Sequence, residues 1–193
     1  MIEILTFMIS WAGPLFFLSL QLSSLYTAFR ILKAKNTLSL SQIPFISMFT
    51  NCFIWVIYAL LMGDIPVLVP NSTGIVAAAI CIYIYESYSH MPISRIYLIS
   101  LITIMIGATL AIYKETQTIG IMGDILAVLM MGSPLSTLYT VLNERSTAAM
   151  PFATSLATWG NAFSWSLYGI LVANDPLVYS FYILFMLIMY LLY

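Results

Sequence analysis

Charged side chains are scarce in this chain, and their scarcity excludes most classes of water-soluble protein. Only 7% of the 193 residues are Asp, Glu, Lys or Arg, whereas 62% are hydrophobic. A soluble domain of this size needs far more charge on its surface, so the mean hydropathy of +1.03 indicates an integral membrane protein. The formal net charge of −1 provides no basic surface for nucleic acid or for anionic lipid.

Cysteine and histidine are rare as well, which argues against a disulfide framework and a metal site. Cys52 and Cys81 each stand inside an apolar run, so we interpret them as small core residues. His90 is the only histidine and has no partner at ligand spacing, so we assign it to an interfacial loop. Because we find no nucleophile motif, metal cluster or phosphate loop, we expect neither an enzyme nor a cofactor.

The chain does contain a series of apolar runs that are long enough to cross a bilayer, separated by short polar breaks. The first run carries Glu3 instead of a cation near its start and is too long for a signal peptide, so we expect it to be retained. The pattern predicts an all-α membrane protein with seven transmembrane helices, at about 4–31, 43–62, 66–85, 94–113, 119–142, 151–173 and 176–193.

The cations predict the orientation of the helices in the membrane. Five of the six Lys and Arg residues fall on one side of the predicted bundle, and only Lys114 falls on the other. The five are Arg30, Lys33, Lys35, Arg95 and Arg145. The positive-inside rule makes their side cytoplasmic, so we expect the N-terminus outside and the C-terminus inside, in the plasma membrane or an endomembrane.

A polar and aromatic pattern occurs twice, at an offset of 110 residues. Each copy has Asn, Trp and Tyr at positions i, i+4 and i+7, which fall on one face of a helix. Such a face is unfavourable toward lipid unless it meets protein or a water-filled cavity, so two copies suggest one cavity lined by two related halves. The matched residues are Asn51 and Asn161, Trp55 and Trp165, and Tyr58 and Tyr168.

The repeat extends over three helices. At the same offset Gly13 matches Gly123, and residues 35–37 match 145–147. Helices one to three therefore match helices five to seven, and helix four is a connector. One linker helix makes the two copies parallel, as in transporters whose substrate site lies at the repeat interface. We divide the chain into a first repeat (1–90), the linker helix (91–116) and a second repeat (117–193).

Ordered segments in both repeats resemble the SWEET sugar transporters, which are saliva-domain proteins related to PQ-loop carriers. The segments are Ser41-Gln42-Ile43-Pro44-Phe45, Trp55-Val56-Ile57-Tyr58, Asp64 followed by Pro70-Asn71-Ser72-Thr73-Gly74, Ser133-Pro134-Leu135-Ser136, Arg145-Ser146-Thr147-Ala148-Ala149-Met150-Pro151-Phe152 and Trp165-Ser166-Leu167-Tyr168-Gly169. The resemblance implies facilitated diffusion of mono- or disaccharides by alternating access. It also implies a fold of three helices, one linker helix and three helices.

Positions along the helices support a binding site. Helices two and three are expected to form a hairpin that turns at Gly63-Asp64. Trp55 lies nine residues before Asp64 and Asn71 lies seven after it, so both are about 10 to 14 Å from the turn at ~1.5 Å per residue. An indole offers a flat apolar face to a pyranose, and an amide offers a donor and an acceptor to hydroxyls.

The resemblance implies roles for these residues. Asn71 corresponds to a sugar-binding asparagine of the family, Trp55 and Trp165 to flanking aromatics, and Asn51 and Asn161 to size-selective positions. Interfacial anchoring by Trp and interhelical hydrogen bonding by Asn are the competing interpretations. The second asparagine of the family pattern is Tyr182 here, preceded by Phe181. We therefore expect a smaller, asymmetric pocket, and a substrate other than sugar stays open.

Three prolines near the cytoplasmic side predict bends. Pro44, Pro134 and Pro151 each lack a backbone N–H and are expected to kink helices two, five and six. The resemblance places them in a four-proline gate whose fourth position is Ser24 here, and a serine bends a helix more weakly. The alternative is that proline is commoner in membrane helices than in soluble ones.

Carboxylates near the outer side have two interpretations each. The resemblance implies that Tyr58 and Tyr168 contact Asp175 and Asp64 and so close an outer gate, whereas surface capping is the alternative for both acids. Asp124 is the one acid well inside a predicted helix. We favour an interfacial carboxylate over a proton-coupling group, because the cost of burying a charge falls near the interface.

Two classes of function remain after these steps. The first is a sugar uniporter, with a small-molecule sugar and the lipid bilayer as partners and homo-oligomers left open. The second is a related helix-bundle carrier for a non-sugar solute or a cargo-sorting receptor. A sorting receptor requires charges inside the bundle, for which Asp124 is the one candidate.

Overall fold

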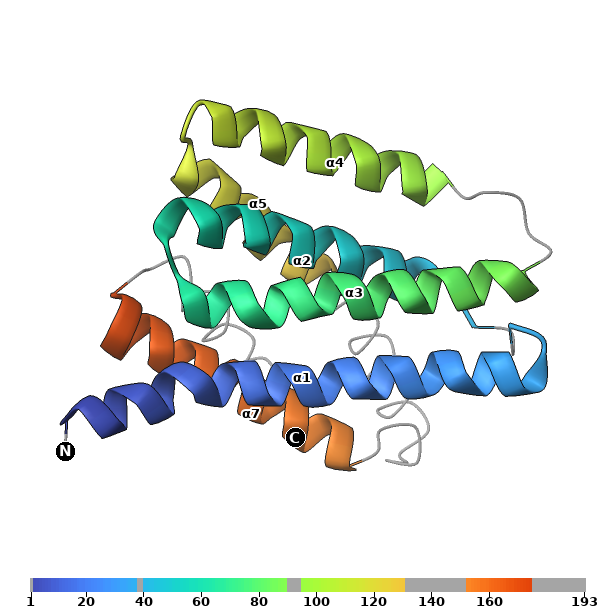
Figure 1. The fold of residues 1–193 in the computed structure, drawn as a ribbon, viewed down its shortest axis with the longest axis horizontal. Helices are drawn as coiled ribbons and strands as arrows, with labels where there is room; N and C mark the ends of the chain where they lie inside the picture. The colour runs from blue at the N-terminus through green and yellow to red at the C-terminus, as the bar shows by residue number, and fades with distance from the viewer. Residues whose placement is uncertain (1, 38–39, 90–94, 131–151, 175–193) are drawn as a thin grey trace, which may run out of the picture. The chain divides into compact units, whose positions relative to one another are not determined.

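The regular structure of the described residues is entirely helical (Figure 1). The computed structural model describes residues 2–37, 40–89, 95–130 and 152–174. The elements are α1 (Ile2–Ala34), α2 (Ile43–Met62), α3 (Ile65–Tyr88), α4 (Arg95–Ile112), α5 (Thr116–Met130), α7 (Phe152–Tyr168) and the short π-helix η2 (Gly169–Ala173). The predicted helix at 176–193 and the end of the predicted helix at 119–142 lie outside the described residues.

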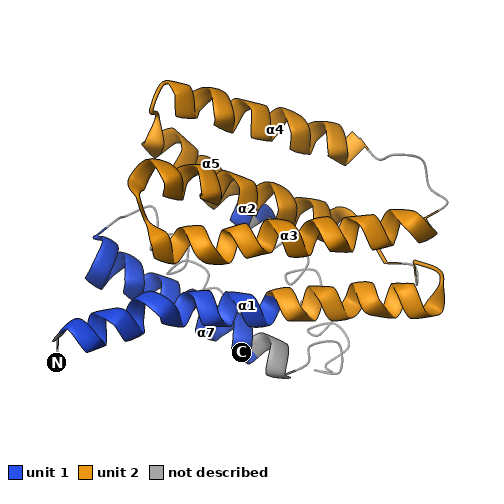
Figure 2. Ribbon diagram, viewed as in Figure 1, with its two compact units in different colours: residues 1–20, 127–193 blue, residues 21–126 orange. Residues whose placement is uncertain are grey.

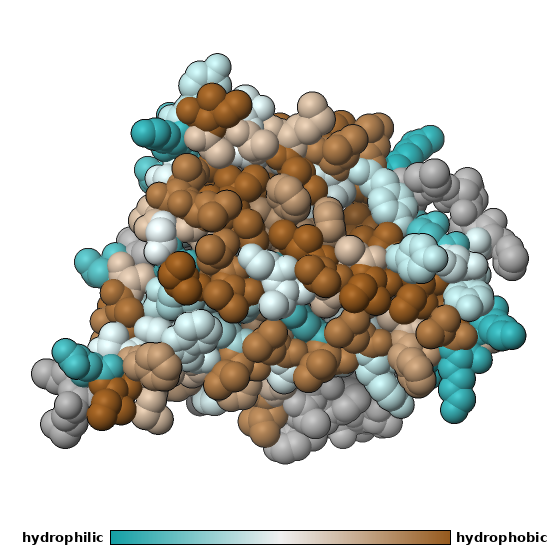
Figure 3. All heavy atoms as spheres, in the orientation of Figure 1, coloured by the Kyte–Doolittle hydropathy of each residue, from teal (hydrophilic) through white to brown (hydrophobic). Residues whose placement is uncertain are grey.

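Four of the described helices are long and apolar enough to cross a membrane. Judged by length and composition, they are Glu3–Ala34, Ile43–Met62, Ile65–Tyr88 and Arg95–Ile112. Their outer side chains are apolar, as Leu5, Tyr83 and Leu101 are 59%, 75% and 55% exposed. Figure 3 shows hydrophobic residues over much of the visible face. Such an exterior suits helices that face lipid instead of water.

The helix bounds follow the predicted ones closely. α2 coincides with the predicted range 43–62. α5 begins at Thr116, three residues before the predicted start. The predicted helix at 151–173 is an α-helix up to Tyr168 and a π-helix from Gly169 to Ala173. Asn174 then ends the segment with a left-handed backbone, at a φ of 48°.

Two residues fix the turn between α2 and α3. Gly63 ends α2 in the left-handed conformation, with a φ of 70° and a ψ of 25°. Asp64 then caps α3, because its carboxylate accepts a hydrogen bond from the Val67 N–H at 3.1 Å. Pro66 follows in the first turn, where its missing N–H breaks no helical bond. The predicted hairpin at Gly63-Asp64 is therefore confirmed.

Replacing Gly63 with alanine is expected to lower the free energy of unfolding by about 1 kcal/mol, because a Cβ is strained at positive φ. No described atom lies within 4 Å of the added Cβ, so crowding contributes nothing. Unfolding in mixed detergent micelles measures the change. Gly63→Asn is the control, because asparagine tolerates this conformation. An equal loss in both variants would contradict the explanation.

The chain divides into two compact units (Figure 2). Unit 1 contains Met1–Leu20 and Ala127–Tyr193, and unit 2 contains Gln21–Leu126. α1 therefore belongs partly to each unit, and each unit draws residues from both sequence repeats. The division at 90 and 117 describes the sequence pattern, whereas the compact units cut across it.

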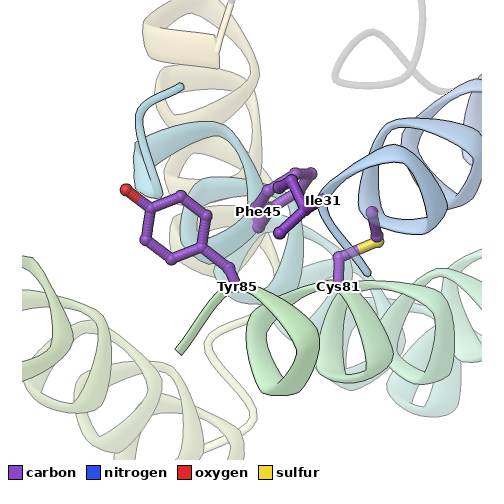
Figure 4. Packing of buried hydrophobic residues seen from close by; sticks show 5 residues of the cluster. Ile31, Phe45, Cys81 and Tyr85 are labelled. Carbon is purple, nitrogen blue, oxygen red and sulfur yellow. The ribbon is translucent and has the colours of Figure 1, made fainter. Parts of the chain in front are cut away.

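The core of unit 2 joins α1, α2 and α3 (Figure 4). Five buried residues form it: Ala28, Ile31, Phe45, Cys81 and Tyr85. The rings of Phe45 and Tyr85 meet edge-on, with centroids 6.2 Å apart. α2 also packs against α4, and the hydroxyls of Thr50 and Ser100 share a hydrogen bond of 2.5 Å there. Cys81 is a free, buried thiol, as predicted.

Candidate substrate-binding site

The predicted polar and aromatic stripe on α2 is buried inside unit 2. Asn51, Trp55 and Tyr58 are 8%, 6% and 2% exposed, so this face points toward protein. The rings of Trp55 and Tyr58 meet edge-on, with centroids 5.3 Å apart and planes at 78°. Such burial is inconsistent with an interfacial anchor, the competing interpretation of Trp55.

The second copy of the stripe, on α7, is buried inside unit 1. Asn161, Trp165 and Tyr168 are 7%, 4% and 5% exposed. The rings of Trp165 and Tyr168 again meet edge-on, with centroids 5.7 Å apart and planes at 86°. Each unit therefore holds one buried stripe with the same ring arrangement.

The two stripes differ at the asparagine. Asn161 Oδ1 accepts a hydrogen bond from the indole N–H of Trp165 at 3.1 Å. Asn51 Oδ1 is enclosed and accepts no hydrogen bond within the described part of the chain. A buried acceptor without a partner costs roughly 1 to 3 kcal/mol, so native structures normally satisfy it. Asn51 thus presents an acceptor that a hydroxyl of a ligand could satisfy.

Asn71 is the buried amide of α3, at 6% exposed. Its Nδ2 donates a hydrogen bond of 2.8 Å to the carbonyl of Val67, one turn earlier in the same helix. That bond uses one of the two amide hydrogens. The second hydrogen and Oδ1 are the groups with which Asn71 can bind a hydroxyl.

Gln21 of α1 is a buried polar residue that sequence reasoning missed. It is 4% exposed, and its Nε2 donates a hydrogen bond of 2.8 Å to the Pro70 carbonyl. The same carbonyl accepts the Thr73 hydroxyl at 2.9 Å. Gln21 therefore ties α1 to α3 beside Asn71. The available signal was a polar side chain in the middle of an apolar run, which requires a partner inside the protein.

α1, α2 and α3 meet closely at Gly74. A Cβ added to Gly74 would lie 2.5 Å from Cys52 Sγ and 3.3 Å from Gln21 Nε2. Cys52 is a free thiol and is fully buried, as predicted for a small core residue. Because Gly74 has no side chain, the turn of α2 that follows Asn51 can approach the turn of α3 that follows Asn71.

Each buried indole also contacts a glycine of the other sequence repeat. In unit 1, a Cβ added to Gly13 of α1 would lie 2.9 Å from Trp165 Cδ2. In unit 2, a Cβ added to Gly123 of α5 would lie 2.8 Å from Trp55 Cε2. Gly13 and Gly123 are the glycines that match at the repeat offset. The two contacts therefore join residues that stand at equivalent positions of the repeat.

The chain matches a family model described as "Sugar efflux transporter for intercellular exchange". The match covers residues 7–92 and 117–193, which is most of both predicted repeats. The chain belongs to the SWEET family. The resemblance carried by the sequence segments is thereby confirmed.

Individual SWEET proteins agree with this assignment. The bidirectional sugar transporter SWEET7 of Arabidopsis thaliana is 32% identical over 178 residues, which cover 85% of this chain and 69% of that protein. The sugar transporter SWEET1 of Dictyostelium discoideum is 27% identical over 192 residues, which cover 92% and 85%.

A solved structure of a eukaryotic SWEET transporter, at 3.7 Å resolution, has the same fold. It matches with a TM-score of 0.85 and 27% sequence identity, over 98% of this chain and 94% of that chain. This match confirms the predicted fold class, in which two parallel three-helix repeats are joined by a linker helix.

Pro44, one of the four gate positions of the SWEET pattern, does not kink α2. It lies in the first turn of α2, which begins at Ile43. At that position a backbone N–H would have no helical carbonyl to bond, so the N–H that proline lacks is not missed. The helix also has no preceding turn with which the proline ring could clash. The kink that we predicted at Pro44 is therefore wrong. The described helices have interior prolines at Pro14 of α1 and Pro70 of α3 instead.

The remaining gate positions of the SWEET pattern are only partly described. Ser24 is half-buried in α1, which continues unbroken past it to Ala34. Asp64 caps α3, as the alternative interpretation of that acid predicts. The other predicted positions lie outside the described residues: Pro134, Pro151, Asp175, Tyr182 and His90.

Asp124 lies deeper in its helix than the sequence suggests. Because α5 begins at Thr116, more than two helical turns precede Asp124. The residue is half-buried and its Oδ1 is enclosed. The sequence favoured an interfacial carboxylate on the basis of a helix that starts at residue 119. The observed start at Thr116 is less consistent with that interpretation.

Proposed function

We propose that this chain carries mono- or disaccharides across a membrane by facilitated diffusion with alternating access. Membership in the SWEET family supports the sugar as substrate class. The single observation that carries the proposal is the enclosed oxygen of Asn51 in the same buried stripe as the Trp55 indole. A polar group without a partner is unfavourable in a membrane helix, and a sugar hydroxyl would satisfy it.

Asn71 and residues of the two stripes would bind the sugar. The amides of Asn71 and Asn51 would bind hydroxyls, because each has a hydrogen-bonding group left over. Trp55 and Trp165 would present indole faces to the apolar side of the sugar ring. Asn161 would act mainly by holding the Trp165 indole, since its oxygen already accepts that N–H.

The other predicted positions complete the proposal. Tyr182 would supply a phenol in place of a second amide and make the pocket smaller. Tyr58 and Tyr168 would close the outer side with Asp175 and Asp64, as family resemblance implies. Pro134, Pro151 and Ser24 would belong to the cytoplasmic gate together with Pro44, and the N-terminus would lie outside.

Uptake of labelled glucose or sucrose into liposomes tests the proposal. Purified protein should equilibrate the sugar across the bilayer without a proton gradient, because a uniporter does not couple the movement of sugar to the movement of a proton. Protein-free liposomes measure the leak. If uptake stops when an imposed pH gradient is removed, the transport is coupled to protons and is not uniport. Uptake equal to the leak for every sugar in a panel would refute sugar transport.

The asymmetry of the stripes sharpens this test. Asn51→Ala should raise KM about tenfold, because it removes an acceptor that has no partner among the described residues and would be satisfied by the ligand. The matched variant Asn161→Ala should raise KM less, because its oxygen is already bonded to Trp165. Equal effects in the two variants would show that the enclosed oxygen of Asn51 does not meet the sugar.

A further inference from the structure

We propose that Gly13 and Gly123 are positioning residues, each of which fixes the place of an indole that belongs to the other sequence repeat. Gly13 of the first repeat contacts Trp165 of the second, and Gly123 of the second repeat contacts Trp55 of the first. The packing stands independently of transport, whereas its importance for sugar binding rests on the proposed function.

Both contacts involve the rigid part of the indole. A Cβ on Gly13 would lie 2.9 Å from both Cδ2 and Cε2 of Trp165, the two carbons that fuse the rings. A Cβ on Gly123 would lie 2.8 Å from Cε2 and 3.0 Å from Nε1 of Trp55. Carbon atoms in contact are normally about 3.5 to 4.0 Å apart. A methyl group at either position therefore has to displace the ring or the helix.

The tyrosine of each stripe limits where the ring can go. Trp55 meets Tyr58 edge-on at 5.3 Å, and Trp165 meets Tyr168 edge-on at 5.7 Å. Both indoles are at most 6% exposed, so they are packed on several sides. An added methyl would change the orientation of the indole, because a close-packed surrounding leaves few voids for the ring to enter.

Glycine is a poor choice for a helix interior unless packing requires it. It destabilises a helix relative to alanine, so an interior glycine usually marks a close approach. Here two such glycines stand at the same position of the repeat and face tryptophans that also match in the repeat. The repeats thus exchange equivalent contacts, with one repeat supplying the ring and the other supplying its space.

Pairs of substitutions test this assignment by size complementation. Gly123→Ala and Gly13→Ala should each raise KM for sugar about tenfold, since small displacements in a binding site have large effects. Trp55→Phe should relieve Gly123→Ala, and Trp165→Phe should relieve Gly13→Ala, to within about threefold of the respective Phe variant. The crossed pairs, Gly123→Ala with Trp165→Phe and Gly13→Ala with Trp55→Phe, should show additive losses.

Gly160 provides the control for crowding between helices. A Cβ on Gly160 of α7 would lie 2.6 Å from the Phe16 ring of α1, so Gly160→Ala crowds the same two helices as Gly13→Ala does. Its effect should not be relieved by Trp165→Phe, because the three nearest atoms to the added Cβ all belong to the Phe16 ring. Relief of both variants by Trp165→Phe would reduce the role of Gly13 to general packing and overturn the proposal.

A spectroscopic measurement makes the test independent of transport. Protein labelled with 5-fluorotryptophan has one fluorine for each of its four tryptophans, and Trp→Phe variants assign the signals. Gly123→Ala should shift the Trp55 signal selectively, and Gly13→Ala the Trp165 signal. Selective shifts in a protein that takes up no sugar would support the proposed packing and would refute only the proposed function. If a glycine variant folds poorly, recovery of folded protein in the matched pair alone supports the assignment. Unselective shifts, or recovery in the crossed pair too, overturn it.

Discussion

Asn71→Ala is expected to reduce the affinity for sugar about tenfold to a hundredfold while leaving the stability of the fold nearly unchanged. The variant removes an amide whose remaining donor and acceptor would bind hydroxyls in a site with little water, where a lost bond costs about 1 to 3 kcal/mol. Within the described part of the chain, the fold loses the bond from Nδ2 to the Val67 carbonyl. That carbonyl keeps the backbone bond of the helix.

Thr73→Ala is the matched control for Asn71→Ala. Thr73 lies on the same helix, and its hydroxyl bonds to the Pro70 carbonyl one turn earlier at 2.9 Å. Its removal therefore deletes the same kind of bond, from side chain to backbone, outside the proposed binding groups. Concentration-dependent uptake into liposomes gives KM and the maximal rate for both variants. Similar KM values for the two variants would remove Asn71 from the binding site.

Gly74→Val is expected to lower the free energy of unfolding by about 1 to 3 kcal/mol. Its Cβ alone would lie 2.5 Å from the fully buried Cys52 Sγ. The β-branched side chain adds further atoms next to Gln21, whose amide lies 3.3 Å from the same Cβ. The variant would therefore separate α2 from α3 and weaken the bond from Gln21 to Pro70.

Ala79→Val separates this packing effect from the effect of a β-branched residue in α3. Ala79 is exposed on the same helix, so the substitution should change the free energy of unfolding only slightly. Unfolding in mixed detergent micelles, followed by circular dichroism, compares the two variants. Comparable stability of Gly74→Val and Ala79→Val would show that α2 and α3 do not need a glycine here.

Much of the fold could be predicted because its causes are local. Apolar runs of membrane length predict helices, and Gly63 with Asp64 predicts a turn, since one residue tolerates positive φ and the next caps a helix. The repeat offset likewise predicts two equivalent faces, and both are buried.

The remaining features depend on which helices pack together, which no local pattern contains. The match between Gly13 and Gly123 was visible, but their contacts with Trp165 and Trp55 join distant segments. The different hydrogen bonding of Asn51 and Asn161 depends on side-chain orientation, which identical spacing does not determine. Pro44 was misjudged although the start of α2 was predicted correctly, because a proline in the first turn of a helix removes no helical hydrogen bond and clashes with no preceding turn.

The division of the chain between units has a consequence for its biosynthesis. Gln21–Leu126 leaves the ribosome as one continuous stretch, so unit 2 can assemble while synthesis continues. Unit 1 joins Met1–Leu20 to Ala127–Tyr193, so residues that are made before unit 2 acquire partners that are made after it. The close contact between the Trp165 indole and Gly13 therefore forms only late in membrane insertion.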